Sequence, residues 1–264
     1  MRYIFDDLKA IGERLRDKQL LLFLDFDGTL APIADTPGKA VIPEKTKKIL
    51  VLLSKKTNCA IAIISGRGLP DIKKKVGLKG IIYSGNHGFQ IEGPKLRCQL
   101  AVPVAYKNRL QGIEAGLKKK LSGIKGVLIE DKKFFLALHF RLADKRKLPF
   151  IKTIFRQSVI QDLKRNKVTV KFGKKVFEIG PPLYWNKGKI VLSLLGRQRV
   201  ISGKQGILPV YIGDDKTDED AFRVLKRKGL TVHVGKSGNS AAAYYLRDTK
   251  EVAEFLDLIS KVTT

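Results

Sequence analysis

The sequence predicts an α/β fold: a Rossmann-like, doubly wound parallel-sheet core with an inserted α+β cap domain. Apolar, β-branched segments alternate with amphipathic segments over residues 20–88, and the same alternation resumes over residues 186–235. Strands that are apolar on both faces and separated by helices are typical of a parallel sheet covered by helices on both sides. The pattern changes between these two halves, which indicates an insertion.

The first half of the core is predicted from the spacing of its apolar residues. It begins with a charged amphipathic helix. The segments are, in chain order, a helix at 1–19, a strand at 20–25, a helix at 43–57, a strand at 59–65, a helix at 69–77 closed by glycine, and a strand at 80–88.

The insertion reads as helix, hairpin, helix, hairpin, which is an α+β pattern. The predicted helices cover 103–123 and 147–166, and the predicted hairpins cover 126–142 and 167–180, the second with Gly173 near its turn. The joints EGPKLRC and GPPLYW carry the glycine and proline of linkers or hinges. We therefore expect a cap at 98–181, inserted into a catalytic core made of 1–97 and 182–264.

The second half of the core completes the alternating pattern. The predicted segments are a helix at 186–198, a strand at 208–215, a helix at 218–229 and a strand at 230–235.

Composition narrows the functional classes. Hydrophobic residues make up 44% and charged residues 29% of the 264 residues, an ordinary globular composition, and the apolar runs are too short to span a bilayer. The start lacks the apolar stretch of a secretion signal, and two cysteines make no disulfide framework, so we expect a cytoplasmic protein without a membrane partner. The net charge of +27 would attract a polyanion. The lysines are dispersed, however, and few aromatic residues lie among them to stack on bases, so nucleic acid is not the expected partner.

Four segments place polar residues at predicted strand ends or helix starts. They are DFDGT at 25–29, SGR at 65–67, WNKG at 185–188 and GDDKTDED at 213–220. In open parallel sheets ligands bind beyond the carboxyl ends of the strands. Asp25, Asp27, Asp214 and Asp218 can there surround a hard divalent cation. Mg²⁺ is the expected ion, because it keeps several water ligands and binds a substrate phosphate together with one or two carboxylates.

The residue types fit phosphoryl transfer. A carboxylate can attack phosphorus, and a second carboxylate two residues on, such as Asp27 after Asp25, can protonate the leaving oxygen and later activate water. Lys187 would neutralise charge on the transferring group. Ser65 and backbone N–H groups near Gly28 and Gly66 would hold its oxygens.

The four motifs resemble those of the haloacid dehalogenase superfamily of phosphatases. With SGNHG at 84–88 and EDKKFFLALHFR at 130–141, the set is similar to the trehalose-6-phosphate phosphatases over nearly the whole chain. The resemblance implies that Asp25 is the nucleophile and that Asp27 is the acid/base, which also offers the metal its backbone carbonyl. It implies that Asp214 binds the metal, with Asp218 and Asp215 as ligands or outer partners, and that Ser65 and Lys187 bind the phosphoryl group.

The resemblance also implies residues that recognise a disaccharide phosphate. They are Gly66, Arg67, Asn86, His87 and Gly88 in the core and Glu130, Lys132, His139, Arg141 and Glu178 in the cap. Two positions depart from the family pattern: Gln90 stands where an acidic residue is usual, and Gly180 where an arginine is usual.

The expected substrate is a small sugar phosphate, with trehalose 6-phosphate first. Sucrose 6-phosphate and mannosyl-3-phosphoglycerate are the alternatives among enzymes. A non-catalytic basic protein that binds polyanions is the alternative from another class. Oligomeric state and regulation are not predicted.

Overall fold

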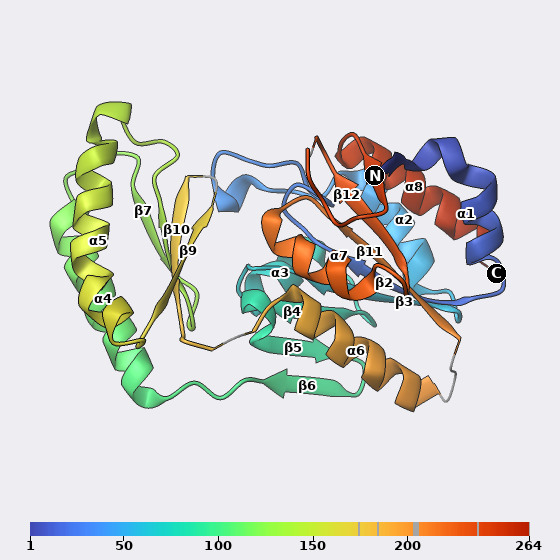
Figure 1. Ribbon diagram of the computed structural model, residues 1–264, viewed down its shortest axis with the longest axis horizontal. Helices are drawn as coiled ribbons and strands as arrows, with labels where there is room; N and C mark the ends of the chain where they lie inside the picture. Colours follow the sequence, from blue (N-terminus) through green and yellow to red (C-terminus); the bar gives the residue numbers. More distant parts are fainter. Residues whose placement is uncertain (174, 184, 203–205, 237, 264) are drawn as a thin grey trace. The chain divides into compact units, whose positions relative to one another are not determined.

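The computed structural model describes residues 1–173, 175–183, 185–202, 206–236 and 238–263, so Lys174 in the predicted hairpin at 167–180 lies outside the described residues. The chain folds as two compact units (Figure 1). One unit comprises Met1–Cys98 and Trp185–Thr264, and the other comprises Gln99–Tyr184.

The first unit is built on one large sheet, which has nine strands in the described part of the chain. Their order is β1 (Arg2–Tyr3), β13 (Tyr244–Leu246), β12 (Leu230–Val234), β11 (Ile207–Gly213), β2 (Gln19–Leu24), β3 (Cys59–Ile64), β4 (Ile82–Gly85), β5 (Gln90–Gly93), β6 (Leu96–Gln99). The pairings from β1 through β4 are parallel, and β5 is antiparallel to β4. The predicted doubly wound parallel sheet is confirmed.

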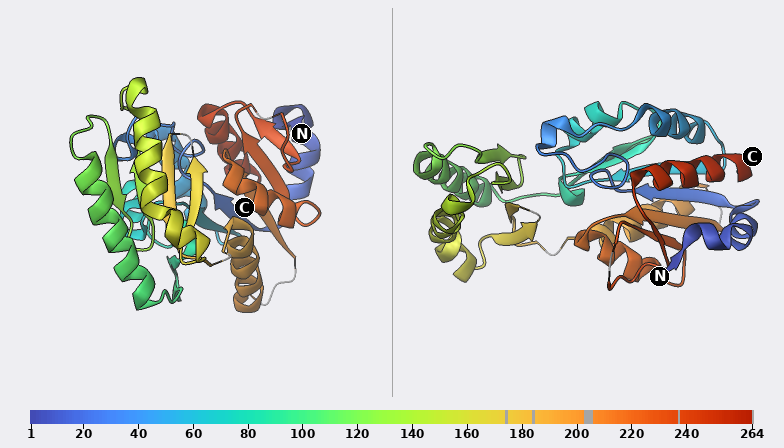
Figure 2. Two further views of the ribbon diagram at one scale, coloured as in Figure 1. Left: turned by 60° about the vertical axis from the view of Figure 1, so that its left-hand side comes forward. Right: turned by 90° about the horizontal axis from the view of Figure 1, so that it is seen from above.

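Helices cover both faces of this sheet (Figure 2). Successive side chains of a strand point to opposite faces, and here both sets are apolar, so each face needs a covering layer. From β2, Leu20, Leu22 and Leu24 pack with residues of one set of helices: α1 (Leu8–Leu15), α2 (Glu44–Ser54), α3 (Leu69–Val76) and α8 (Thr249–Val262). Leu21 and Phe23 pack with residues of α6 (Lys187–Ser202) and α7 (Glu219–Leu225). Each of these five side chains is fully buried, which contributes about 1.5–3 kcal/mol of transfer free energy apiece.

The second unit is a four-stranded antiparallel sheet, counted over its described residues, with two helices. The strand order is β7 (Leu128–Asp131), β8 (Leu136–His139), β10 (Val176–Gly180), β9 (Thr169–Gly173), and the helices are α4 (Val104–Leu121) and α5 (Leu148–Lys164). Leu136, Leu138, Phe177 and Ile179 point to one face and form the core with these helices. Strand alternation sends the intervening residues to the opposite face.

The structure corrects several predicted elements. The helix expected at 1–19 is instead β1, a 3-10 turn η1 (Ile4–Asp7) and α1, and the strand expected at 80–88 ends at Gly85. The joint EGPKLRC, expected to be a linker, contributes residues to β5 and β6. β13 and α8 lie beyond the last predicted strand. The remaining 3-10 turns are η2 (Pro37–Lys39), η3 (Asn86–Gly88), η4 (Lys145–Lys147) and η5 (Lys216–Asp218).

Among the helices that the structure describes, none combines the length and the apolar composition that a bilayer span requires.

The two cysteines differ in environment, which leads to a first prediction. Cys59 on β3 is buried, and burial raises its thiol pKa to about 12, whereas Cys98 is exposed. The thiolate is the reactive form, so iodoacetamide at neutral pH should modify Cys98 in the native protein and reach Cys59 only after unfolding. Mass spectrometry of the alkylated peptides tests this. Equal modification of both thiols under native conditions would contradict the buried position of β3.

Candidate active site

The candidate site lies where the order of the sheet reverses. The chain runs from β2 to β3 and β4 on one side, and β11 later pairs with the other side of β2. Asp25 follows β2 and Asp214 follows β11, and the N–H of Asp25 donates to the Ile212 carbonyl at 3.0 Å. Since both strands end at the same edge, their acidic side chains meet where open α/β sheets bind ligands.

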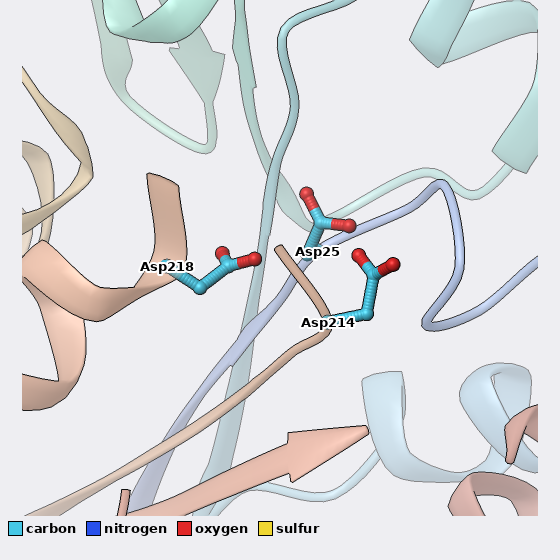
Figure 3. A group of neighbouring side chains, drawn as sticks. All are labelled: Asp25, Asp214 and Asp218. Carbon is cyan, nitrogen blue, oxygen red and sulfur yellow. The ribbon is translucent and has the colours of Figure 1, made fainter. Parts of the chain in front are cut away.

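Three carboxylates gather at this edge (Figure 3). Asp25, Asp214 and Asp218 each offer an oxygen, and these oxygens lie within 4.8 Å of one another. Asp25 and Asp218 are buried and Asp214 is half-buried. An all-oxygen set of this kind fits a hard divalent cation, and a cation would offset the mutual repulsion of the carboxylates.

Two glycines allow the carboxylates to approach the backbone. A Cβ on Gly28 would lie 2.2 Å from Oδ2 of Asp214, and the φ of Gly28 is +88°, which favours glycine. A Cβ on Gly213 would lie 2.3 Å from Cγ of Asp218. Both glycines are therefore required by the packing of the acidic cluster.

Lys187, the first residue of α6, supplies a positive charge to this cluster. Its ammonium donates to Asp25 Oδ1 and to Asp218 Oδ1, each at 2.6 Å, and its side chain is 5% exposed. Burial lowers the pKa of Lys187, but the charges of Asp218 and Asp25 outweigh burial and raise it above its ordinary value. Burial raises the pKa of Asp25, with the charge of Lys187 opposing and those of Asp218 and Asp214 adding to the rise. The lysine therefore stays charged among acidic groups that repel one another.

Asp218 is held by two further donors. The hydroxyl of Tyr211 on β11 donates to its Oδ1 at 2.5 Å, and the N–H of Asp215 donates to its Oδ2 at 2.9 Å. Burial and the charge of Asp218 raise the pKa of Tyr211, so its hydroxyl keeps the proton that it donates. The sequence reasoning missed Tyr211, although a hydroxyl within the apolar run LPVYIG was a readable signal.

Removing this hydroxyl should cost stability. Tyr211 is fully buried, so Tyr211→Phe should lower the free energy of unfolding by about 1.5–3 kcal/mol, the range for a hydrogen bond to a charged group. Urea denaturation measures the change. Tyr245→Phe on β13, a half-buried ring that packs against Tyr3, is the control and should cost less than about 0.5 kcal/mol. Equal effects of the two substitutions would contradict the role of the Tyr211 hydroxyl.

Asp27 lies outside the acidic cluster and is bound by Arg67. The guanidinium donates from Nε to Asp27 Oδ2 at 2.7 Å and from Nη2 to Oδ1 at 2.6 Å, and from Nη1 to Asp71 Oδ2 at 2.9 Å. Burial lowers the pKa of Arg67, but its hydrogen bonds and ion pairs with Asp27 and Asp71 raise it overall. Arg67, expected to bind substrate, is engaged by two carboxylates here, and sequence reasoning missed Asp71.

Ser65 and the SGNHG segment form one turn system beside β3 and β4. Ser65 accepts the N–H of Arg67 on its hydroxyl at 3.1 Å and the N–H of His87 on its carbonyl at 3.2 Å. Asn86, His87 and Gly88 have φ values of 51°, 52° and 89°. These left-handed residues end β4.

This turn places a histidine against the second motif. A Cβ on Gly66 would lie 2.6 Å from Cε1 of His87, so the glycine makes room for the ring. Gln90, the departure from the family pattern, accepts the Asn86 amide on Oε1 at 2.9 Å. The glutamine thereby supports the left-handed turn from the start of β5.

The predicted cap residues gather on the polar face of the second unit. Glu130, Ala137 and Glu178 are directly paired across β7, β8 and β10. Lys132 donates to Glu178 at 2.9 Å, and His139 Nε2 lies 2.8 Å from Glu130 Oε2. Arg141, beyond the end of β8, is exposed.

The second departure, Gly180 at the end of β10, has a packing explanation. A Cβ there would lie 2.6 Å from Cε1 of Phe135, which is buried, and 3.3 Å from the hydroxyl of Thr169. Phe135 therefore occupies the space that a side chain at position 180 would enter.

Comparison with known proteins gives one consistent result. The model of the family "Trehalose-phosphatase" matches residues 23–250. Trehalose-phosphate phosphatase B of Arabidopsis thaliana is 34% identical over 96% of this chain and 69% of its own length, and the Mycobacterium tuberculosis trehalose-phosphate phosphatase is 33% identical over 99% and 67%. The trehalose-6-phosphate phosphatase C-terminal domain of C. albicans superposes with a TM-score of 0.81 at 26% identity, covering 98% of both chains. The resemblance of the motifs is thus confirmed, and the chain belongs to the trehalose-phosphatase family.

Proposed function

We propose that this protein is a Mg²⁺-dependent phosphatase that hydrolyses trehalose 6-phosphate to trehalose and phosphate. The observation that carries the proposal is a buried aspartate, Asp25, which shares one edge of the sheet with two further carboxylates and with the ammonium of Lys187. Family membership supports the same chemistry. We take the unit Met1–Cys98 with Trp185–Thr264 as the catalytic core and Gln99–Tyr184 as its cap.

Asp25, Asp214 and Asp218, with the backbone carbonyl of Asp27, would hold the ion, and Asp215 would support Asp218 through its N–H. Mg²⁺ when bound supplies charge neutralisation to the phosphate and to the carboxylates. Oxygen-only ligands favour this ion over thiol- or imidazole-seeking metals.

The chain's own residues provide the nucleophile and the acid/base for two steps, transfer of the phosphoryl group to Asp25 and its hydrolysis. Asp25 attacks phosphorus, the bond to the sugar oxygen breaks, and Asp27 gives that oxygen a proton. Asp27 then takes a proton from water as the water oxygen attacks phosphorus and the bond to Asp25 breaks. Lys187 would neutralise the phosphoryl group, and Ser65 with the backbone near Gly66 would bind its oxygens.

The polar face of the second unit supports a sugar substrate. Glu130, Lys132, His139 and Glu178 offer donors and acceptors from neighbouring strands, and Arg141 follows β8. A site built to bond hydroxyl groups discriminates strongly against analogues that lack them. In the core, Asn86, His87 and Gly88 would add contacts. Two free cysteines support action in the cytoplasm.

The test is phosphate release from a panel of sugar phosphates, with Mg²⁺ and with chelator. The panel contains trehalose 6-phosphate, sucrose 6-phosphate, mannosyl-3-phosphoglycerate and glucose 6-phosphate. We expect a clear preference for trehalose 6-phosphate that is lost on chelation. Preference for another ester would overturn the substrate and keep the chemistry. Inactivity on the panel, with salt-dependent retention on a polyanion matrix, would favour the binding-protein alternative for this +27 chain.

A further inference from the structure

Arg67 is held by contacts to both its backbone and its side chain. Its N–H donates to the Ser65 hydroxyl, its carbonyl accepts the N–H of Asn86 at 2.6 Å, and its guanidinium carbon lies 5.1 Å from the ring centroid of Phe26. The side chain is 9% exposed. Backbone and side chain are thus both fixed by neighbours within the core.

The guanidinium of Arg67 binds two carboxylates, that of Asp71 and that of Asp27, the proposed acid/base. Asp71 lies in the first turn of α3, so the helix sets its position, and it takes one Nη1 hydrogen bond. Asp27 receives the two-pronged fork of Nε and Nη2. A bidentate pair of this kind fixes the plane of the carboxylate as well as its distance.

We propose that Asp71 and Arg67 form a clamp that positions the carboxylate of Asp27 for its two proton transfers. The inference rests on the phosphatase chemistry proposed above, in which the proton passes from Asp27 to the leaving oxygen and returns from the attacking water. Arg67 and Asp71 are positioning residues: neither is assigned to the reacting atoms. When Asp27 carries the proton on one oxygen, the other oxygen still accepts from Arg67.

Esters that differ in leaving group separate this role from a structural one. 4-Nitrophenyl phosphate has a leaving group that departs without a proton, whereas phenyl phosphate has one that needs a proton. Arg67→Lys keeps the charge but removes the fork. It should lower kcat/KM for phenyl phosphate by about 10–100-fold, a part of the usual contribution of general acid catalysis, and change 4-nitrophenyl phosphate by less than about threefold.

Substitution of Asp71 should disturb the fold less than substitution of Arg67, since the Asp71 side chain is 45% exposed. Asp71→Ala should lower kcat/KM for phenyl phosphate by about threefold to tenfold, and Asp71→Asn, which keeps an acceptor oxygen, should recover most of that loss. The matched control is Asp257→Ala on α8, which breaks an exposed i,i+4 pair with Lys261 of 2.6 Å and should leave both esters unchanged.

Equal losses on the two esters, or no loss in Arg67→Lys and Asp71→Ala, would overturn the clamp. This result is independent of the sugar: failure of trehalose 6-phosphate as substrate would overturn the proposed function, while the aryl esters would still decide the clamp. A wild-type protein inert in Mg²⁺ towards both aryl esters and towards every sugar phosphate of the panel would remove the chemistry on which the clamp rests, and the clamp with it.

Discussion

Asp25→Asn should lose phosphatase activity by about 10⁴-fold or more, since an amide cannot form the covalent intermediate that splits the reaction into two steps. Phosphate release from trehalose 6-phosphate measures the loss. A phosphoryl-labelled substrate should leave label on the wild-type protein after rapid acid quench and none on the variant. Asp17→Asn, in the exposed turn after α1, is the matched control and should keep wild-type activity.

The same substitution should leave the metal-free protein at least as stable as the wild type. Burial raises the pKa of Asp25, and Asp218 and Asp214 add to the rise, so the ionised form is disfavoured in the folded state despite the opposing charge of Lys187. A neutral amide of the same size removes that cost, as is common at active sites that trade stability for function. Urea denaturation in chelator tests the sign. Wild-type turnover by Asp25→Asn would contradict the nucleophile, and a large loss of stability would contradict the electrostatic argument.

The position of the acidic residues at the strand ends could be predicted from the sequence. Hydrophobic periodicity locates the strands, and a parallel topology brings their carboxyl ends to one edge. Asp25 and Asp214 each follow an apolar run, and parallel strands bring such residues to one edge. The prediction needed no knowledge of side-chain geometry. It brings Asp25 and Asp214, which lie far apart in the chain, close together as the structure does, but it also places Asp27 with them, and the structure does not.

Contacts that depend on side-chain direction could not be predicted in this way. The pairing of Asp27 with Arg67 rather than with the cluster depends on how the chain turns after β2, where Gly28 has positive φ. Asp71 becomes relevant only because Arg67, four residues earlier and just before α3, binds both Asp71 and Asp27. Periodicity describes the faces of helices and strands, whereas Asp27 and Arg67 lie outside them and meet Asp71 in the first turn of α3.

Some missed elements did have local signals. α8 begins after Asp248, whose carboxylate accepts the N–H groups of Lys250 and Glu251, and its apolar residues recur at helical spacing. β5 and β6 lacked such a signal, since the glycine and proline of EGPKLRC are equally typical of a linker. Their pairing with the sheet is a tertiary contact that the local sequence does not specify.

Lys187→Met should have the opposite effect on stability from Asp25→Asn. Its ammonium is the cation that Asp25 and Asp218 share, and its removal leaves buried carboxylates uncompensated, a loss of about 3–5 kcal/mol when a buried pair is broken from one side. Urea denaturation in chelator should show this loss, and added Mg²⁺ should restore a larger part of the stability in the variant than it adds to the wild type, because the ion would replace the missing charge. Activity should fall by about 10²–10³-fold, the usual effect of removing one transition-state donor. Lys189→Met, an exposed position on the same helix, should change neither quantity. If Lys187→Met were as stable as the wild type in chelator, the carboxylates would not depend on this lysine, and the electrostatic account of the site would be wrong.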